Sequence, residues 1–144
     1  MPTDVKVGIV GAGANTTAKH IPLLQEIDGV EIMGVVNRSA SSSDAVARRF
    51  GIPRTYDHWD QAVADPDTNA IVIGTWPYLH CPVTLAALAA GKHVLTEARM
   101  AMNADEALRM LKASEAGPEQ VAQVVPSPIT LFADATIQRL LAEE

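Results

Sequence analysis

Short apolar runs alternate along the chain with longer segments in which apolar residues recur at helical spacing. Continuous or nearly continuous apolar runs are typical of strands in a parallel sheet that is covered by helices. The pattern predicts strands at residues 5–10, 30–36, around Tyr56, 70–73, 93–96 and 120–125. The predicted helices lie at residues 16–27, 45–50, 57–64, 80–90, 104–115 and 131–142. We expect Pro22 to kink or shorten the first of them.

This order of strands and helices predicts the fold class. Alternating strands and helices place parallel strands side by side with helices on both faces of the sheet. We therefore expect an α/β fold: a Rossmann-type doubly wound parallel sheet of three layers in a single domain. The 144 residues suffice for one such domain, and a hydrophobic share of 48% with an aromatic share of 4% predicts a mostly aliphatic core.

The overall composition narrows the range of partners. The formal net charge of −6, without a local cluster of lysine and arginine, argues against nucleic acid or an anionic membrane. The chain start shows no basic segment followed by an apolar one, and the apolar run at residues 85–90 is too short to span a membrane. We therefore expect a cytoplasmic location. The spacing of histidine, cysteine and carboxylate residues predicts no metal site.

A glycine-rich turn follows directly on the first predicted strand. Gly11 permits a tight turn, and Gly13 lets the backbone approach a pyrophosphate without an intervening side chain. The next helix would open at Ala14, Asn15 and Thr16 and offer its free N–H groups to the phosphates. Thr16 occupies the third position of the fingerprint, where glycine or alanine is usual. The turn predicts a dinucleotide site, and the competing interpretation is a tight strand-to-helix turn without a ligand.

The end of the second predicted strand bears on the choice of dinucleotide. Ligands of doubly wound sheets bind at the carboxyl ends of the strands. An acidic residue there would bind the ribose 2′-OH and repel a phosphate, but this chain has Asn37, Arg38 and Ser39. A guanidinium pairs well with a 2′-phosphate. These residues favour NADP over NAD, unless Arg38 is an ordinary solvated cation.

The segment after the fourth predicted strand carries further candidates. Thr75, Trp76 and Pro77 form a predicted loop, and Trp76 stands out in an aromatic-poor chain. Trp76 would either line the nicotinamide–ribose pocket or pack on a neighbouring loop or domain. His80 opens the next helix and would either donate toward the cofactor or substrate or bond only to backbone groups.

Several segments, taken in order and spacing, resemble one known family. The clearest is residues 91–97, which read Gly-Lys-His-Val-Leu-Thr-Glu. Residues 7–13 with His20 downstream also agree with the family pattern, as do residues 30–38, 50–56, 70–80 and 103–111. Over about residues 4–142 the chain is similar to the N-terminal domain of the glucose–fructose oxidoreductase / inositol dehydrogenase / rhizopine-catabolism (Gfo/Idh/MocA) family.

The resemblance implies a function and a domain organisation. Members of this family are NAD(P)-dependent oxidoreductases that act on sugars, cyclitols and related polyols. By resemblance, residues 1–126 form the dinucleotide-binding Rossmann domain, and residues 127–144 lead toward an absent C-terminal α+β substrate domain. The chain alone would then bind a nicotinamide dinucleotide without turnover. The amphipathic helix predicted at residues 131–142 would favour self-association into a homo-oligomer.

One departure from the family pattern concerns catalysis. The family signature after the fifth strand is Glu-Lys-Pro, and this chain has Glu97, Ala98 and Arg99. By resemblance, Glu97 contacts the cofactor, and Glu97 and Arg99 lie near the reaction site. The family lysine is missing, and Arg99 cannot serve as a general base at ordinary pH. The missing lysine keeps open the alternative of a non-catalytic dinucleotide-binding or regulatory module. The glycine-rich turn keeps open a second alternative, a transferase that uses S-adenosylmethionine, whose own turn can look similar.

Overall fold

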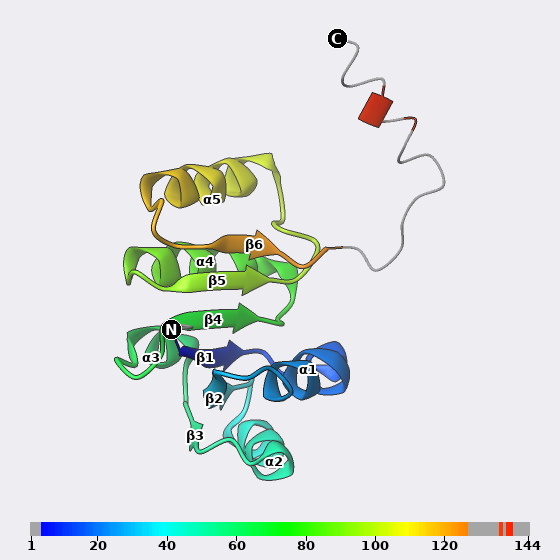
Figure 1. Cartoon of the computed structure of the whole chain (residues 1–144), viewed down its shortest axis with the longest axis vertical. Helices are drawn as coiled ribbons and strands as arrows, with labels where there is room; N and C mark the ends of the chain where they lie inside the picture. Colours follow the sequence, from blue (N-terminus) through cyan, green and yellow to red (C-terminus); the bar gives the residue numbers. More distant parts are fainter. Residues whose placement is uncertain (1–3, 127–135, 137, 140–144) are drawn as a thin grey trace.

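The computed structural model describes residues 4–126 together with residues 136, 138 and 139. Its strands form one parallel sheet in the order β3-β2-β1-β4-β5-β6, with every neighbouring pair parallel (Figure 1). This is the doubly wound Rossmann order, in which the winding direction reverses between β1 and β4. The strands are β1 (Val5–Val10), β2 (Val30–Val36), β3 (Arg54–Thr55), β4 (Ala70–Ile73), β5 (His93–Thr96) and β6 (Ala122–Val124).

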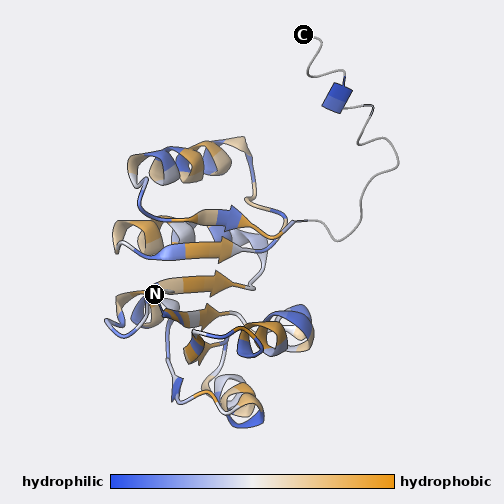
Figure 2. Cartoon of the chain, viewed as in Figure 1, coloured by the Kyte–Doolittle hydropathy of each residue, from blue (hydrophilic) through white to orange (hydrophobic). Residues whose placement is uncertain are grey.

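Helices cover both faces of the sheet and confirm the predicted three layers. One face packs α1 and α2 against β1 and β2 around a cluster that includes Ile9, Ile21 and Val46. The opposite face packs α3 and α4 around a cluster that includes Ile71 and Val83. Figure 2 shows the apolar strands lying between helices that are each part apolar and part polar. The helices are α1 (Ile21–Gln25), α2 (Ala40–Phe50), α3 (Trp59–Ala64), α4 (His80–Ala89) and α5 (Ala104–Ala116).

Four strands begin and end where the hydrophobic pattern predicts: β1, β2, β4 and β5. The other two differ from the prediction. β3 ends at Thr55, although the Tyr56 N–H still donates to the Val35 carbonyl at 3.2 Å. The ring of Tyr56 then covers Gly34, where a Cβ would overlap it. β6 covers residues 122–124 instead of the predicted 120–125.

The first predicted helix differs most in its form. Helical structure begins at Ala14 and ends at Gln25, and residues Thr16–His20 form a π turn in which the Ile21 N–H donates to the Thr16 carbonyl. Pro22 explains the change, because it has no N–H for an α-helical bond and its ring would crowd the preceding turn.

The helix predicted at residues 45–50 was wrong at its start. α2 begins at Ala40, because Ser39 is the N-cap and its side chain accepts a hydrogen bond from the Ser42 N–H. The other three predictions within the described residues were close. α3 begins at Trp59 instead of residue 57, and α4 and α5 end within one residue of their predicted ends. The helix predicted at residues 131–142 lies mostly outside the described residues, so the self-association based on it stays a prediction.

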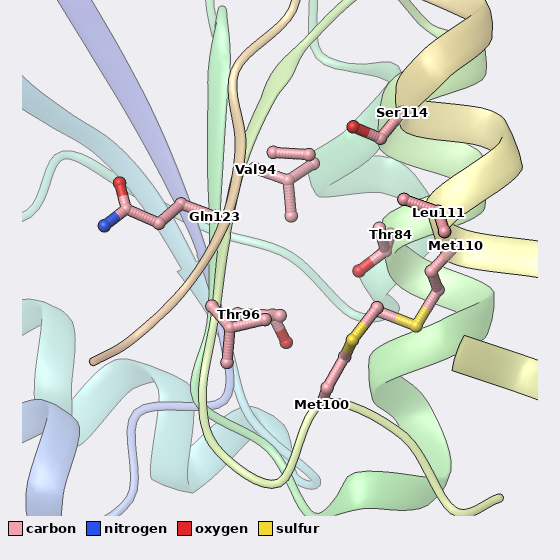
Figure 3. Close-up of a pocket in the computed structure, with 10 residues that line it drawn as sticks. Thr84, Val94, Thr96, Met100, Met110, Leu111, Ser114 and Gln123 are labelled. Carbon is pink, nitrogen blue, oxygen red and sulfur yellow. The ribbon is translucent and has the colours of Figure 1, made fainter. Parts of the chain in front are cut away.

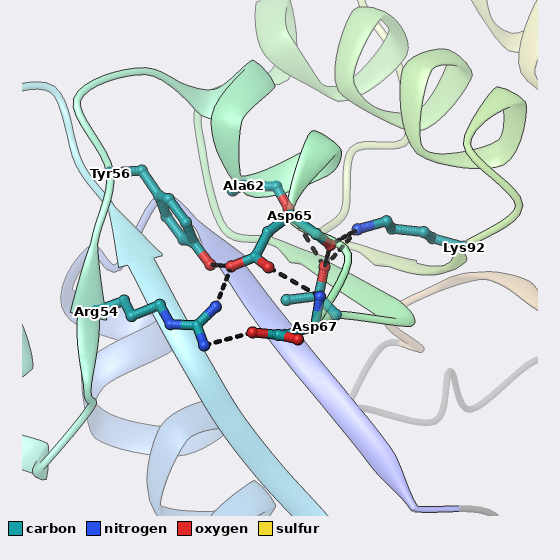
Figure 4. A network of polar contacts seen from close by, with 7 residues as sticks. Arg54, Tyr56, Ala62, Asp65, Asp67 and Lys92 are labelled. Carbon is teal, nitrogen blue, oxygen red and sulfur yellow. Dashed lines mark hydrogen bonds and ion pairs between the residues drawn. The ribbon is translucent and has the colours of Figure 1, made fainter.

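A polar network braces the amino edge of the sheet (Figure 4). Arg54 donates to Asp65 at 2.7 Å and to Asp67 at 2.5 Å, and the Tyr56 hydroxyl donates to Asp65 at 2.6 Å. Buried Lys92 donates to the Asp65 carbonyl at 2.6 Å. Burial would raise the pKa of Asp65, but the hydrogen bonds from Tyr56, the Asp67 N–H and Arg54 lower it below the usual value. The network therefore has a structural role, at the end of the sheet opposite to the predicted site.

Candidate functional site

The turn after β1 lies in contact with the loop after β4. Gly11 has a φ of 87°, a conformation that favours glycine, and its N–H donates to the Val36 carbonyl at 2.8 Å. A Cβ at Gly11 would lie 2.5 Å from Thr75 Cγ2 and 2.8 Å from Thr75 N. Gly11 therefore lets two loops meet at the carboxyl edge, where the winding of the sheet reverses.

Gly13 has the surroundings that a phosphate-binding turn requires. It is exposed, and a Cβ there would meet only the Gly74 carbonyl oxygen, at 4.0 Å. Helical structure follows from Ala14, and the first N–H groups of a helix have no partner within it. Open space beside free N–H groups fits the pyrophosphate of a dinucleotide. The residues present therefore fit the cofactor that the sequence predicts.

Thr16 fits against the sheet because Gly74 has no side chain. Thr16 is fully buried, and a Cβ at Gly74 would overlap both Thr16 Oγ1 and the Gly11 carbonyl oxygen. The usual fingerprint places a small residue on the helix for this close approach. Here the small residue lies on the loop after β4, so the departure at Thr16 is matched by its neighbour.

Asn37 forms hydrogen bonds within the chain, whereas Arg38 has no partner among the described residues. The Asn37 amide oxygen accepts from the Ala12 N–H at 2.7 Å, and its amide nitrogen donates to the Ser42 hydroxyl at 2.9 Å. Asn37 thus ties the glycine turn to the start of α2. The Arg38 side chain is exposed and makes no hydrogen bond or ion pair within the part of the chain that the structure describes. Ser39 lies beside it and caps α2.

The loop after β4 places its aromatic residues in solvent and its histidine in the core. A 3₁₀ turn spans Pro77–Leu79, flanked by Trp76 at 73% exposed and containing Tyr78 at 57%. His80 is fully buried, with Nδ1 at 2.8 Å from the Arg99 carbonyl oxygen and Nε2 at 2.9 Å from that of Thr75. His80 therefore joins two loops of the carboxyl edge, and its predicted contact with a cofactor stays a prediction.

Glu97 meets the helix that follows the glycine turn. Its Oε1 accepts from Asn15 Nδ2 and from His20 Nε2, each at 2.5 Å. Ala98 is exposed and can hold no proton, and the guanidinium of exposed Arg99 has no partner among the described residues. Sequence reasoning missed His20 as a site residue, although its recurrence in the family pattern was a signal.

One hollow among the described residues lies elsewhere. A pocket of about 110 Å³ lies between α4, α5, β5 and β6, and Thr84, Thr96, Met100 and Met110 are among its lining residues (Figure 3). The hydroxyls of Thr84 and Thr96 are buried there, and neither has a hydrogen-bond partner in the part of the chain that the structure describes. Within the described ranges, no three histidine, cysteine or carboxylate side chains could jointly hold a metal ion. The helices in those ranges are all too short or too polar to cross a membrane.

Comparison with known proteins identifies the family. The profile of the Gfo/Idh/MocA oxidoreductase family, described by its NAD-binding Rossmann fold, matches residues 5–124. A 4-carboxy-2-hydroxymuconate-6-semialdehyde dehydrogenase of Sphingobium is 33% identical over 114 residues, covering 78% of this chain and 36% of that protein. Inositol 2-dehydrogenase of Acidothermus cellulolyticus is 33% identical over 118 residues, covering 81% and 35%.

Solved structures agree with this. Biliverdin reductase of Synechocystis, in complex with biliverdin and NADP+, has a TM-score of 0.78 at 25% identity, covering 85% of this chain and 38% of that one. The chain thus spans little more than a third of the length of these relatives. With a family match over the whole sheet and a glycine turn that fits a dinucleotide, the chain belongs to the Gfo/Idh/MocA oxidoreductase family and forms its NAD(P)-binding Rossmann domain.

Proposed function

We propose that the chain holds NADP(H) for hydride transfer to or from a sugar, cyclitol or related polyol. The observation that carries the cofactor choice is the exposed guanidinium of Arg38 at the end of β2, which has no partner among the described residues. The Asn37 amide forms hydrogen bonds with the Ala12 N–H and the Ser42 hydroxyl. Because this amide carries no charge, it does not repel a 2′-phosphate. Arg38 would pair with that phosphate, and the hydroxyls of Ser39 and Ser41, 3.3 Å apart, lie at the same loop.

The rest of the cofactor would lie along the carboxyl edge. The backbone at Gly13, Ala14 and Asn15 would hold the pyrophosphate, and Thr75, Trp76 and Pro77 would line the nicotinamide side. When bound, the nicotinamide ring supplies the hydride chemistry. The exposure of Trp76 supports this role, because a bound ring would cover a side chain that is 73% exposed. His80 would act indirectly, by holding the loop that carries Trp76.

The substrate class rests on the relatives. Inositol 2-dehydrogenase acts on a cyclitol, as its name states, whereas the names of the semialdehyde dehydrogenase and of biliverdin reductase give other substrates for those proteins. Glu97 and Arg99 lie at the carboxyl edge and would stand near the reaction. Because Ala98 replaces the lysine that the family pattern carries, the described residues supply positioning and charge more readily than a general base.

The cofactor preference can be measured by fluorescence titration. We expect NADPH to bind more tightly than NADH. Arg38→Ala should weaken NADPH binding roughly 10- to 100-fold, because one charge-assisted contact with the phosphate is lost, and should leave NADH binding nearly unchanged. Arg48→Ala is the matched control, because it removes the same charge from the last turn of α2. Tighter binding of NADH by the unsubstituted chain, or an equal loss in both variants, would refute the assignment.

Turnover is a separate question. We expect the 144-residue chain to bind the dinucleotide and to show no oxidation of polyols such as inositols with NADP+ or NAD+. The substrate domain that the family resemblance implies is not among these residues, and at the position of the family lysine Ala98 holds no proton, while Arg99 is not a base at ordinary pH. Absorbance of the reduced cofactor measures the rate. A clear rate would contradict this expectation and leave the binding proposal intact.

A further inference from the structure

The carboxylate of Glu97 is held at a fixed place on the carboxyl edge. Its own N–H donates to the Ile73 carbonyl at 3.0 Å, which extends the pairing of β5 with β4 by one residue. Its Oε1 accepts from both Asn15 and His20, at 2.5 Å each. The side chains of His20 and Glu97 are only 15% and 19% exposed. Backbone and side chain of Glu97 are therefore both constrained.

The second oxygen of this carboxylate has no partner among the described residues. Both hydrogen bonds end on Oε1, and Oε2 accepts none from that part of the chain. Burial would raise the pKa of Glu97, but the hydrogen bonds from His20 and Asn15 lower it below the usual value. Glu97 is then ionised at neutral pH, and an ionised carboxylate only accepts hydrogen bonds. A fixed acceptor of this kind, at a side chain that is partly exposed, can accept from the hydroxyl of a bound ligand.

The order of strands in the sheet indicates which part of the dinucleotide would donate to Glu97 Oε2. A dinucleotide in this fold lies across the switch point, with its pyrophosphate at the turn after β1. Arg38 follows β2, on one side of β1, and Glu97 follows β5, on the other side. With the adenosine end at Arg38, the nicotinamide half of the dinucleotide reaches the side of Glu97.

Resting on the proposed function, we infer that His20 is a positioning residue for the cofactor: with Asn15 it orients Glu97 so that Oε2 accepts from a ribose hydroxyl of the nicotinamide half. His20 itself touches Glu97 and not the reacting atoms. The π turn at Thr16–His20 is what brings His20 next to Asn15, with 3.4 Å between Nε2 and Nδ2.

A comparison of ligands that contain both halves of the cofactor, or only its adenosine half, tests the role of His20. We expect His20→Leu to weaken NADPH roughly tenfold, as for loss of one hydrogen bond to a charged group. Binding of 2′,5′-ADP, which lacks the nicotinamide riboside, should not change. His20→Gln should restore most of the affinity, because its amide nitrogen can donate. Glu97→Gln should lose about as much as His20→Leu, and the double variant no more than either alone.

Further outcomes decide against the inference. If His20→Leu weakens NADPH and 2′,5′-ADP equally, or neither, or if His20→Gln does not restore affinity, His20 is merely structural or has no role. A third ligand, ADP-ribose 2′-phosphate, retains the second ribose, so His20→Leu should weaken its binding as much as that of NADPH. If its binding is unchanged, the ribose hydroxyl is not the donor. If the unsubstituted chain binds neither NADPH nor NADH, the proposed function fails together with the inference. Circular dichroism checks that each variant is folded.

Discussion

Gly11→Ala should destabilise the domain by about 3 kcal/mol or more and abolish dinucleotide binding. An alanine at a φ of 87° pays a left-handed penalty of about 1–2 kcal/mol. Its Cβ would also lie 2.5 Å from Thr75 Cγ2 and 2.9 Å from Gly74 C. The opposing loop cannot retreat freely, because the Gly74 N–H donates to the Val10 carbonyl at 2.9 Å. Denaturant unfolding measures the stability, and NADPH titration measures the binding.

Two other glycines make this experiment specific. Gly51→Ala isolates the backbone penalty, because Gly51 has a φ of 66° and an added Cβ would meet nothing within 4 Å. We expect this variant to lose about 1 kcal/mol of stability. Gly13→Ala has room for the methyl group, so it should leave stability nearly unchanged while weakening NADPH at least tenfold. If Gly11→Ala were no less stable than Gly51→Ala, the contact with Thr75 would be unimportant. If Gly13→Ala bound NADPH normally, the pyrophosphate would not lie at Gly13.

His80→Ala should be the second large effect, with a loss of roughly 3–4 kcal/mol of stability. The ring is fully buried, so its removal leaves a cavity, and the carbonyl oxygens of Thr75 and Arg99 lose the ring nitrogens that lie 2.9 and 2.8 Å from them. Because these carbonyls belong to the loops after β4 and β5, NADPH affinity should fall as well. Both losses can be measured on one preparation, by urea unfolding and by fluorescence titration.

Cys81→Ala is the matched control for His80→Ala. Cys81 is the next residue of α4 and is equally buried, but the polar contact of its side chain is a long one, 3.8 Å from Sγ to the Glu106 carbonyl oxygen. A small cavity predicts a loss of about 1 kcal/mol and unchanged NADPH affinity. If His80→Ala lost no more stability than Cys81→Ala, or kept full affinity, the view of His80 as the joint between the two loops would be wrong.

Local patterns were enough for most of the fold. The strands at residues 5–10, 70–73 and 93–96 were predicted correctly because each is a short run rich in apolar or β-branched residues and bounded by polar or turn residues, a signal carried within a few positions. The start of α2 was missed because its first turn is Ala-Ser-Ser-Ser, which has little apolar periodicity and also suits a loop. The form of the first helix was missed because a π turn leaves no periodic signature of its own.

The features of the candidate site also divide into those that local sequence determines and those that depend on distant residues. The sequence by itself determined the glycine turn, the absence of an acidic side chain at Asn37 and Arg38, and the replacement of the family lysine by Ala98, because residue identity alone decides each of these. Only the tertiary structure decided that Gly74 makes room for Thr16, since that fit joins residues on different elements. It also decided the contact of His20 with Glu97, which lie 77 positions apart. In an α-helix Asn15 and His20 would point about 140° apart, and the π turn that Pro22 favours brings both to the same carboxylate.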